Sequence, residues 1–115
     1  MSNTNENRVL VTQLPSRREG DSWVPSIDIS PAQKWGEIKI LLPMGMNFPT
    51  ADLVREQLYS ALEVFDRERD ILLPMGDPIV QAFACAMLGA HFGQFRMLKW
   101  DRHDKAYNVF EINAD

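Results

Sequence analysis

Several features that would narrow the function are missing from this 115-residue chain. Its single cysteine, Cys85, has no partner for a disulfide within the chain, which suits a reducing compartment. No apolar run approaches the roughly 20 residues of a membrane-spanning helix. Residues 1–8 also lack the apolar core of a secretory signal peptide. These absences predict a soluble cytoplasmic protein with no membrane partner.

The sequence also lacks a recognisable catalytic or metal centre. No Ser-His-Asp set can be assembled from it, and His91 and His103 stand at no known metal-ligand spacing from Cys85. A reactive thiolate needs a lowered pKa and access to solvent, and the neighbours of Cys85 in the sequence supply neither. We therefore predict no catalytic residue, no metal and no cofactor, with Cys85 as a small buried side chain.

Basic charge is scarce as well. The chain has 12 Lys and Arg against 16 Asp and Glu, a formal net charge of −4, whereas nucleic-acid binding usually needs a basic face for the phosphates. Only residues 91–105 are locally basic, through Arg96, Lys99, Arg102 and Lys105. This segment could contact nucleic acid, but a solvated hairpin is the simpler interpretation, and the acidic balance disfavours the first.

An alternation of strand-like and helix-like segments is present instead. Thr50 and Asp77 are good helix N-caps, Pro78 suits a first helical position, and Gly93 ends the second helix. The apolar spacing predicts helices over residues 50–65 and 78–92, and strands over residues 37–42, 70–73, 94–100 and 107–112. The charged residues 66–70 form the return loop after the first helix, with side chains in solvent.

The N-terminal third gives weaker signals. Residues 1–7 are expected to be disordered, residues 8–14 to form a strand, and residues 16–22 a polar loop. Residues 23–29 are extended, with Pro25 limiting them to a sheet edge. Residues 30–36 suggest one helical turn that Ser30 caps.

This order of elements predicts an α/β fold. Successive βαβαβ units give a Rossmann-like, mostly parallel sheet with right-handed crossovers, followed by a C-terminal antiparallel hairpin. The strand over residues 8–14 is then an N-terminal extension. One α/β domain over residues 8–115 accounts for the chain length.

The stretch ILLPMG occurs twice, at residues 40–45 and 71–76. A strand that is buried on both faces is a continuous apolar run, Pro ends it, and Gly permits a tight exit. Both loops then leave the carboxyl ends of parallel strands, which is where open α/β sheets bind ligands. The candidate ligand-binding residues there are Met44, Gly45, Asn47, Thr50, Met75, Gly76 and Asp77.

A nucleotide is one candidate ligand for these loops. Neither loop is a G-x-G-x-x-G motif or carries a P-loop lysine. Asp77 would repel a phosphate, although it could accept a hydrogen bond from a ribose hydroxyl. The alternative is that Asp77 and Thr50 serve only as helix caps and Asn47 only as a turn residue.

The second helix has no formally charged side chain after Asp77. A helix that is apolar on all sides is buried on more than one side, which is difficult in a domain of this size. Either the N-terminal segment covers it, or a second copy does so in a homo-oligomer. The interface residues in the second case are Phe83, Ala86, Met87 and Ala90.

Five stretches give the chain a family resemblance: VTQLPSR (residues 11–17), WVPSIDISPA (23–32), GEIKILLP (36–43), GDP (76–78) and LKWDR (98–102). Together they resemble a group of small proteins encoded by tailed bacteriophages, over residues 8–112. The resemblance implies a viral protein in the host cytoplasm, and it transfers no catalytic residue because the group has no established activity.

We therefore expect a non-enzymatic phage accessory protein that acts by protein–protein binding or self-assembly in the host cell. Its partners would be its own copy or a host or phage protein. One alternative is a nucleotide-binding module that sequesters or degrades a host signalling nucleotide, by fold-level analogy with small phage proteins. The other is nucleic-acid binding through the basic hairpin.

Overall fold

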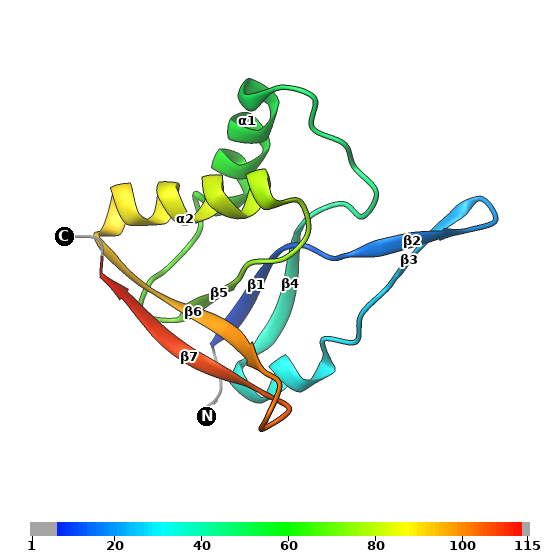
Figure 1. Cartoon of the computed structure of the whole chain (residues 1–115). Helices are drawn as coiled ribbons and strands as arrows, with labels where there is room; N and C mark the ends of the chain where they lie inside the picture. Colours follow the sequence, from blue (N-terminus) through cyan, green and yellow to red (C-terminus); the bar gives the residue numbers. More distant parts are fainter. Residues whose placement is uncertain (1–6, 114–115) are drawn as a thin grey trace, which may run out of the picture.

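The computed structural model describes residues 7–113 and shows an α/β fold built on one five-stranded sheet (Figure 1). The strand order is β4-β1-β5-β6-β7, in which β7 alone is antiparallel to its neighbour. Helices α1 and α2 cover one face and the short 3-10 helix η1 lies against the other. The elements are β1 (Arg8–Gln13), β2 (Ser16–Glu19), β3 (Ser22–Pro25), η1 (Ser30–Trp35), β4 (Glu37–Leu42), α1 (Ala51–Leu62), β5 (Asp70–Leu73), α2 (Pro78–Phe92), β6 (Gln94–Asp101) and β7 (Ala106–Asn113).

The first strand is the main correction to the predicted topology. Instead of extending the sheet at one side, β1 lies between β4 and β5 and pairs in parallel with both. Five of its six residues are buried, as expected for a strand covered on both faces. A mostly parallel sheet and the C-terminal antiparallel hairpin are confirmed. A Rossmann-like strand order is not confirmed, and the connection from β1 to β4 runs through the hairpin β2–β3 and η1 instead of a crossover α-helix.

The two ILLPMG copies differ in their surroundings. The second copy begins in β5, where all four residues are buried. The first copy ends β4, which is an edge strand, and Ile40 there is 42% exposed. The expectation that both copies are strands buried on two faces is therefore wrong for the first one. An apolar run specifies a strand, but its place in the sheet depends on which other strand pairs with it.

The connection from β1 to β4 also differs from expectation. The predicted polar loop forms the strand β2, which pairs with β3 in a hairpin that projects from the domain (Figure 1). The residue that caps η1 is Ile29, and Ser30 supplies no side-chain cap. Instead, Ser30 N donates to Asp28 Oδ1 at 2.9 Å, and this bond lowers the pKa of Asp28 below its ordinary value. In addition, α1 ends three residues earlier than predicted, at Leu62.

The sheet separates two apolar layers because β1 and β5 alternate their side chains between its faces. On the helical side, Leu10 and Leu72 pack with α1 and α2. On the other side, Val9, Val11 and Ile71 pack with η1 and the hairpin β6–β7. The buried side chains of the helical layer include Leu10, Leu42, Val54, Leu58, Leu62, Phe65, Leu72, Val80, Ala84, Leu88 and Phe95.

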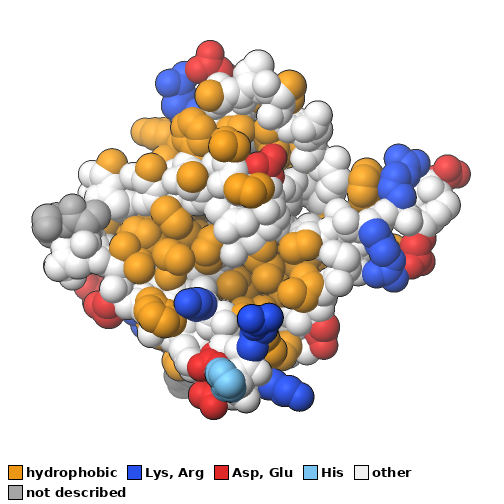
Figure 2. Space-filling model, viewed as in Figure 1, with side chains coloured by type: hydrophobic (Ala, Val, Ile, Leu, Met, Phe, Trp, Pro, Cys, Tyr) orange, Lys and Arg blue, Asp and Glu red, His pale blue; other side chains and the backbone are white. Residues whose placement is uncertain are grey.

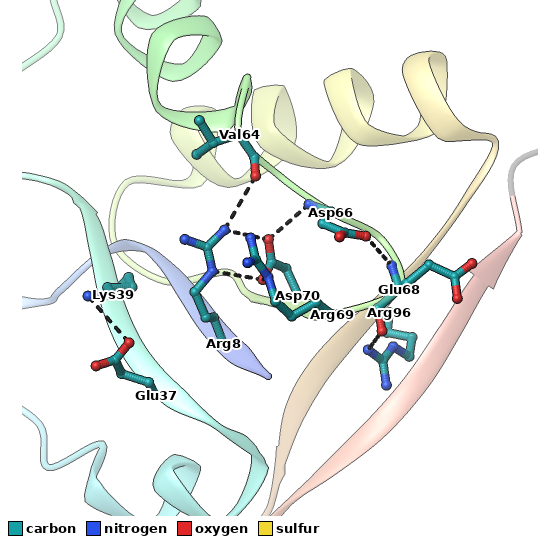
Figure 3. A network of polar contacts seen from close by, with 9 residues as sticks. All are labelled: Arg8, Glu37, Lys39, Val64, Asp66, Glu68, Arg69, Asp70 and Arg96. Carbon is teal, nitrogen blue, oxygen red and sulfur yellow. Dashed lines mark hydrogen bonds and ion pairs between the residues drawn. The ribbon is translucent and has the colours of Figure 1, made fainter. Parts of the chain in front are cut away.

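A buried ion pair lies at the amino edge of the sheet (Figure 3). Asp70, the first residue of β5, is fully buried and lies beside Arg8, the first residue of β1. Arg8 Nη2 donates to Asp70 Oδ2 at 2.7 Å and Arg8 Nε donates to Oδ1 at 2.9 Å. The backbone N–H of Asp66 and the side chain of Arg69 donate to the same carboxylate. The expectation that residues 66–70 are a solvated loop is thus wrong for Asp70.

The pKa of Asp70 follows from these contacts. Burial acts to raise it, but the hydrogen bonds from Arg8, from the backbone of Asp66 and from Arg69 outweigh burial. The net result is a pKa below the ordinary value of an aspartate, so the carboxylate is charged at neutral pH. This charged group joins β1, β5 and the turn after α1.

Candidate functional site

The two Pro-Met-Gly loops meet at the carboxyl edge of the sheet, on either side of β1, and Gln13 links them. Gln13 Nε2 donates to the carbonyl oxygens of Pro43 (3.2 Å) and Met46 (3.1 Å) in the first loop. Its Oε1 accepts from Asp77 N in the second loop at 3.4 Å. Gln13 is only 6% exposed, so its side chain is packed between the two loops.

Thr12 holds the second loop from the neighbouring position of β1. Its Oγ1 donates to Met75 O at 2.6 Å and accepts from Met75 N at 2.8 Å. Sequence reasoning missed both Thr12 and Gln13. The available signal was a pair of polar residues at the end of an apolar strand, but its meaning depends on β1 being central in the sheet.

Both glycines of the repeat have a left-handed backbone, with φ of 73° at Gly45 and 86° at Gly76. Glycine reaches this region without a steric penalty. The two positions are also crowded: a Cβ at Gly45 would overlap the ring of Trp23, and one at Gly76 would lie 2.7 Å from Gln13 O. The repeated motif is therefore explained by two tight turns beneath packed side chains.

The candidate ligand-binding residues Met44, Gly45, Asn47, Thr50, Met75, Gly76 and Asp77 do lie on these two loops at one edge of the sheet. Two of them already have structural roles. Thr50 Oγ1 accepts from Leu53 N at 3.2 Å, and Asp77 Oδ1 accepts from Ile79 N at 2.8 Å, which confirms both as helix N-caps. Binding of a nucleotide to the loops stays a prediction.

The solvent-facing side of α2, which we call its crest, carries no formally charged side chain. Its buried residues are Val80, Ala84 and Leu88, and the opposite side leaves Ile79 55% exposed. Ala82, Ala86 and Ala90 are exposed along the same side, while Phe83 and Met87 are half-buried. The helix is therefore covered on one side only, by the sheet and α1.

A largely apolar groove lies between the C-terminal ends of α1 and α2, with a volume of about 590 Å³, and Glu63 is also part of its lining. Tyr59 and Leu62 of α1 line one wall, and Met87, Ala90 and His91 of α2 line the other. Tyr59 is 69% exposed. Figure 2 shows apolar side chains gathered over the helices and over the strands below α2. We define the α2 surface as Tyr59, Leu62, Ala82, Phe83, Ala86, Met87 and Ala90.

The four basic residues of the C-terminal hairpin do not gather on one face. Arg96 and Lys99 point to opposite faces of β6, because their positions differ by an odd number. Arg96 donates to the carbonyl oxygen of Glu68 at 3.1 Å, and Lys99 Nζ lies 5.8 Å from the ring centroid of Phe110. Arg102 and Lys105 occupy the turn. This arrangement gives no continuous basic track for a phosphate backbone.

Cys85 lies between α2 and β6, and its Sγ is 3.8 Å from Met97 Sδ. Burial raises the pKa of this thiol, the opposite of what a reactive cysteine requires. Within residues 7–113, no three His, Cys, Asp or Glu side chains are grouped so that they could hold a metal ion. None of the helices in the same range is long and apolar enough to cross a bilayer.

Comparison with known proteins gives one match. A family model described as "Phage Pam3 gp32-like protein" matches residues 7–114, which is nearly the whole chain. No curated protein and no solved structure matches the chain.

Proposed function

The chain belongs to the phage Pam3 gp32-like protein family, and on that premise we propose that it is a phage accessory protein that binds another protein through the α2 surface. The observation that carries this proposal is that α2, which has no formally charged side chain, leaves one side exposed to solvent. Monomeric proteins rarely leave large contiguous apolar areas in water, and such areas often mark protein-binding sites. The matched family agrees with the resemblance to tailed-phage proteins drawn from the sequence.

The groove and the crest support protein binding for separate physical reasons. The groove offers Tyr59 and Met87, side chains of the kinds that are enriched at protein interfaces. The crest offers Ala82, Ala86 and Ala90, whose small side chains permit close approach of a partner's backbone. A partner that buries both removes apolar area from water without having to desolvate a charge on α2.

The charge substitution Ala86→Glu tests the α2 surface. We expect it to leave the fold intact, because Ala86 is exposed on a helix, and to weaken partner binding roughly tenfold or more, since an unpaired carboxylate would be buried in the complex. The measurement is quantitative capture, on the immobilised chain, of proteins from cells infected with a phage that encodes it.

Ala51→Glu is the matched control, because Ala51 is also an exposed alanine on a helix. A protein that wild type and Ala51→Glu retain but Ala86→Glu loses is the expected partner. Equal retention by all three chains would show that the α2 surface is not the binding site.

A further inference from the structure

The two edges of the sheet are protected unequally. The edge strand β4 has six residues and carries Glu37 and Lys39, joined by an ion pair of 3.4 Å. The edge strand β7 has eight residues, of which Glu111 alone is charged. Charged side chains on an edge strand discourage pairing with another chain. By this criterion β7 is the open edge of the sheet, and Figure 1 shows it as the outermost strand.

The hydrogen bonds of β7 indicate which of its backbone groups point away from β6. Trp35 Nε1 donates to Tyr107 O at 3.0 Å, so this carbonyl points away from the ladder with β6. Backbone groups alternate in direction along a strand, so the N–H and C=O of Val109 and Glu111 point outward as well. In the described part of the chain, no hydrogen bond outside the ladder with β6 reaches the backbone of residues 109–111.

We propose that β7 pairs antiparallel with β7 of a second copy, around a two-fold axis that places the two Phe110 side chains opposite each other. Val109 of each chain then faces Glu111 of the other, and their outward N–H and C=O groups form the new ladder. The result is one continuous ten-stranded sheet. This pairing goes beyond the proposed function and does not depend on it, because the α2 surface lies elsewhere.

The register centred on Phe110 is favoured because the two neighbouring registers are each unfavourable. Centring the pair on Val109 would need the Tyr107 carbonyl, which already accepts from Trp35. Centring it on Glu111 would place two like charges directly opposite each other, which is destabilising. Centring it on Phe110 avoids both problems and uses every outward group of Val109 and Glu111.

The side chains around Phe110 fit this arrangement. Phe110 is 47% exposed and lies on the same face as Met97, its partner in the β6–β7 register. A second Phe110 would cover its exposed ring in a cross-strand aromatic pair.

A disulfide cross-link tests the register. In a Cys85→Ala background, Phe110→Cys places one thiol per chain at the axis. Phe110 would form a non-hydrogen-bonded pair, in which Cα atoms are about 4.5 Å apart, within the range of about 4.4–6.8 Å that a disulfide requires. Ile40→Cys is the control, because Ile40 is 42% exposed on the other edge strand. We expect covalent dimers from Phe110→Cys only, and equal cross-linking of the two variants would overturn the proposal.

The second test is the mass of the full chain in solution, measured by sedimentation equilibrium. We expect wild type to have the mass of two chains and Val109→Pro the mass of one, since proline removes the outward N–H. The variant should remain folded, because the ladder with β6 does not use that N–H. A single-chain mass for wild type at all concentrations would overturn the proposal, and if Val109→Pro unfolds, the cross-link decides. Loss of the dimer would leave partner capture by the α2 surface unaffected, so each proposal can fail alone.

Discussion

Asp70→Asn is expected to lower the free energy of unfolding by about 3 kcal/mol or more, as removal of one partner of a buried ion pair generally does. The substitution keeps the shape of the side chain but removes its charge. Arg8 Nε and Nη2 would then face an amide, and one of the two oxygen acceptors would be lost. Arg8 is 21% exposed, so water can solvate part of the guanidinium, and this sets the effect near the lower end of the usual range.

Chemical denaturation measures this effect, and Asp52→Asn is its matched control. Asp52 also pairs with an arginine, Arg55, at 3.1 Å, but its side chain is 84% exposed. Exposed pairs contribute little to stability, so the control should stay close to wild type. Similar losses in the two variants would show that the buried network of Figure 3 adds nothing beyond an ordinary surface pair.

The same carboxylate sets a pH dependence. The pKa of Asp70 is lower in the folded state than its ordinary value, so the folded protein binds fewer protons there than the unfolded chain does. Its stabilisation is therefore complete above about pH 5 and is lost as the pH falls through the folded-state pKa. We expect the unfolding free energies of wild type and Asp70→Asn to converge in acid. Parallel curves down to the lowest pH at which both fold would contradict this.

The sequence could not reveal the Arg8–Asp70 pair, because the partners are 62 positions apart and meet only when β1 and β5 pair. A run such as residues 66–70 is charged throughout, and nothing local distinguishes its one buried member. The same limit explains the misplacement of β1. Its apolar run predicted a strand correctly, but the order of strands in a sheet depends on contacts between distant segments.

Local signals were more reliable than distant ones. The caps at Thr50 and Asp77, the proline at position 78 and the end of α2 at Gly93 are all confirmed, because each depends on a few neighbouring residues. Ser30 failed as a cap since Asp28 offers its carboxylate to the backbone at that point. For the candidate site, the sequence identified the uncharged α2 but could not show that its crest would remain exposed in the folded chain.

The repeated ILLPMG motif provides a second large expected effect, in Gly76→Ala. We expect a loss of about 3 kcal/mol, which combines the cost of a left-handed alanine with that of overpacking. The added Cβ would lie 2.7 Å from Gln13 O and 2.8 Å from Gln13 Cβ. Both belong to Gln13, which pairs with Leu42 of β4 and donates to Pro43 O and Met46 O, so it cannot move away without disturbing these bonds.

Gly20→Ala separates the two costs. Gly20 also has a left-handed backbone, with φ of 63°, but a Cβ there would meet nothing within 4 Å. This variant should lose only the conformational part, about 1–2 kcal/mol, so the difference between the two variants measures the crowding against Gln13. Equal losses by chemical denaturation would mean that β1 yields to the methyl group.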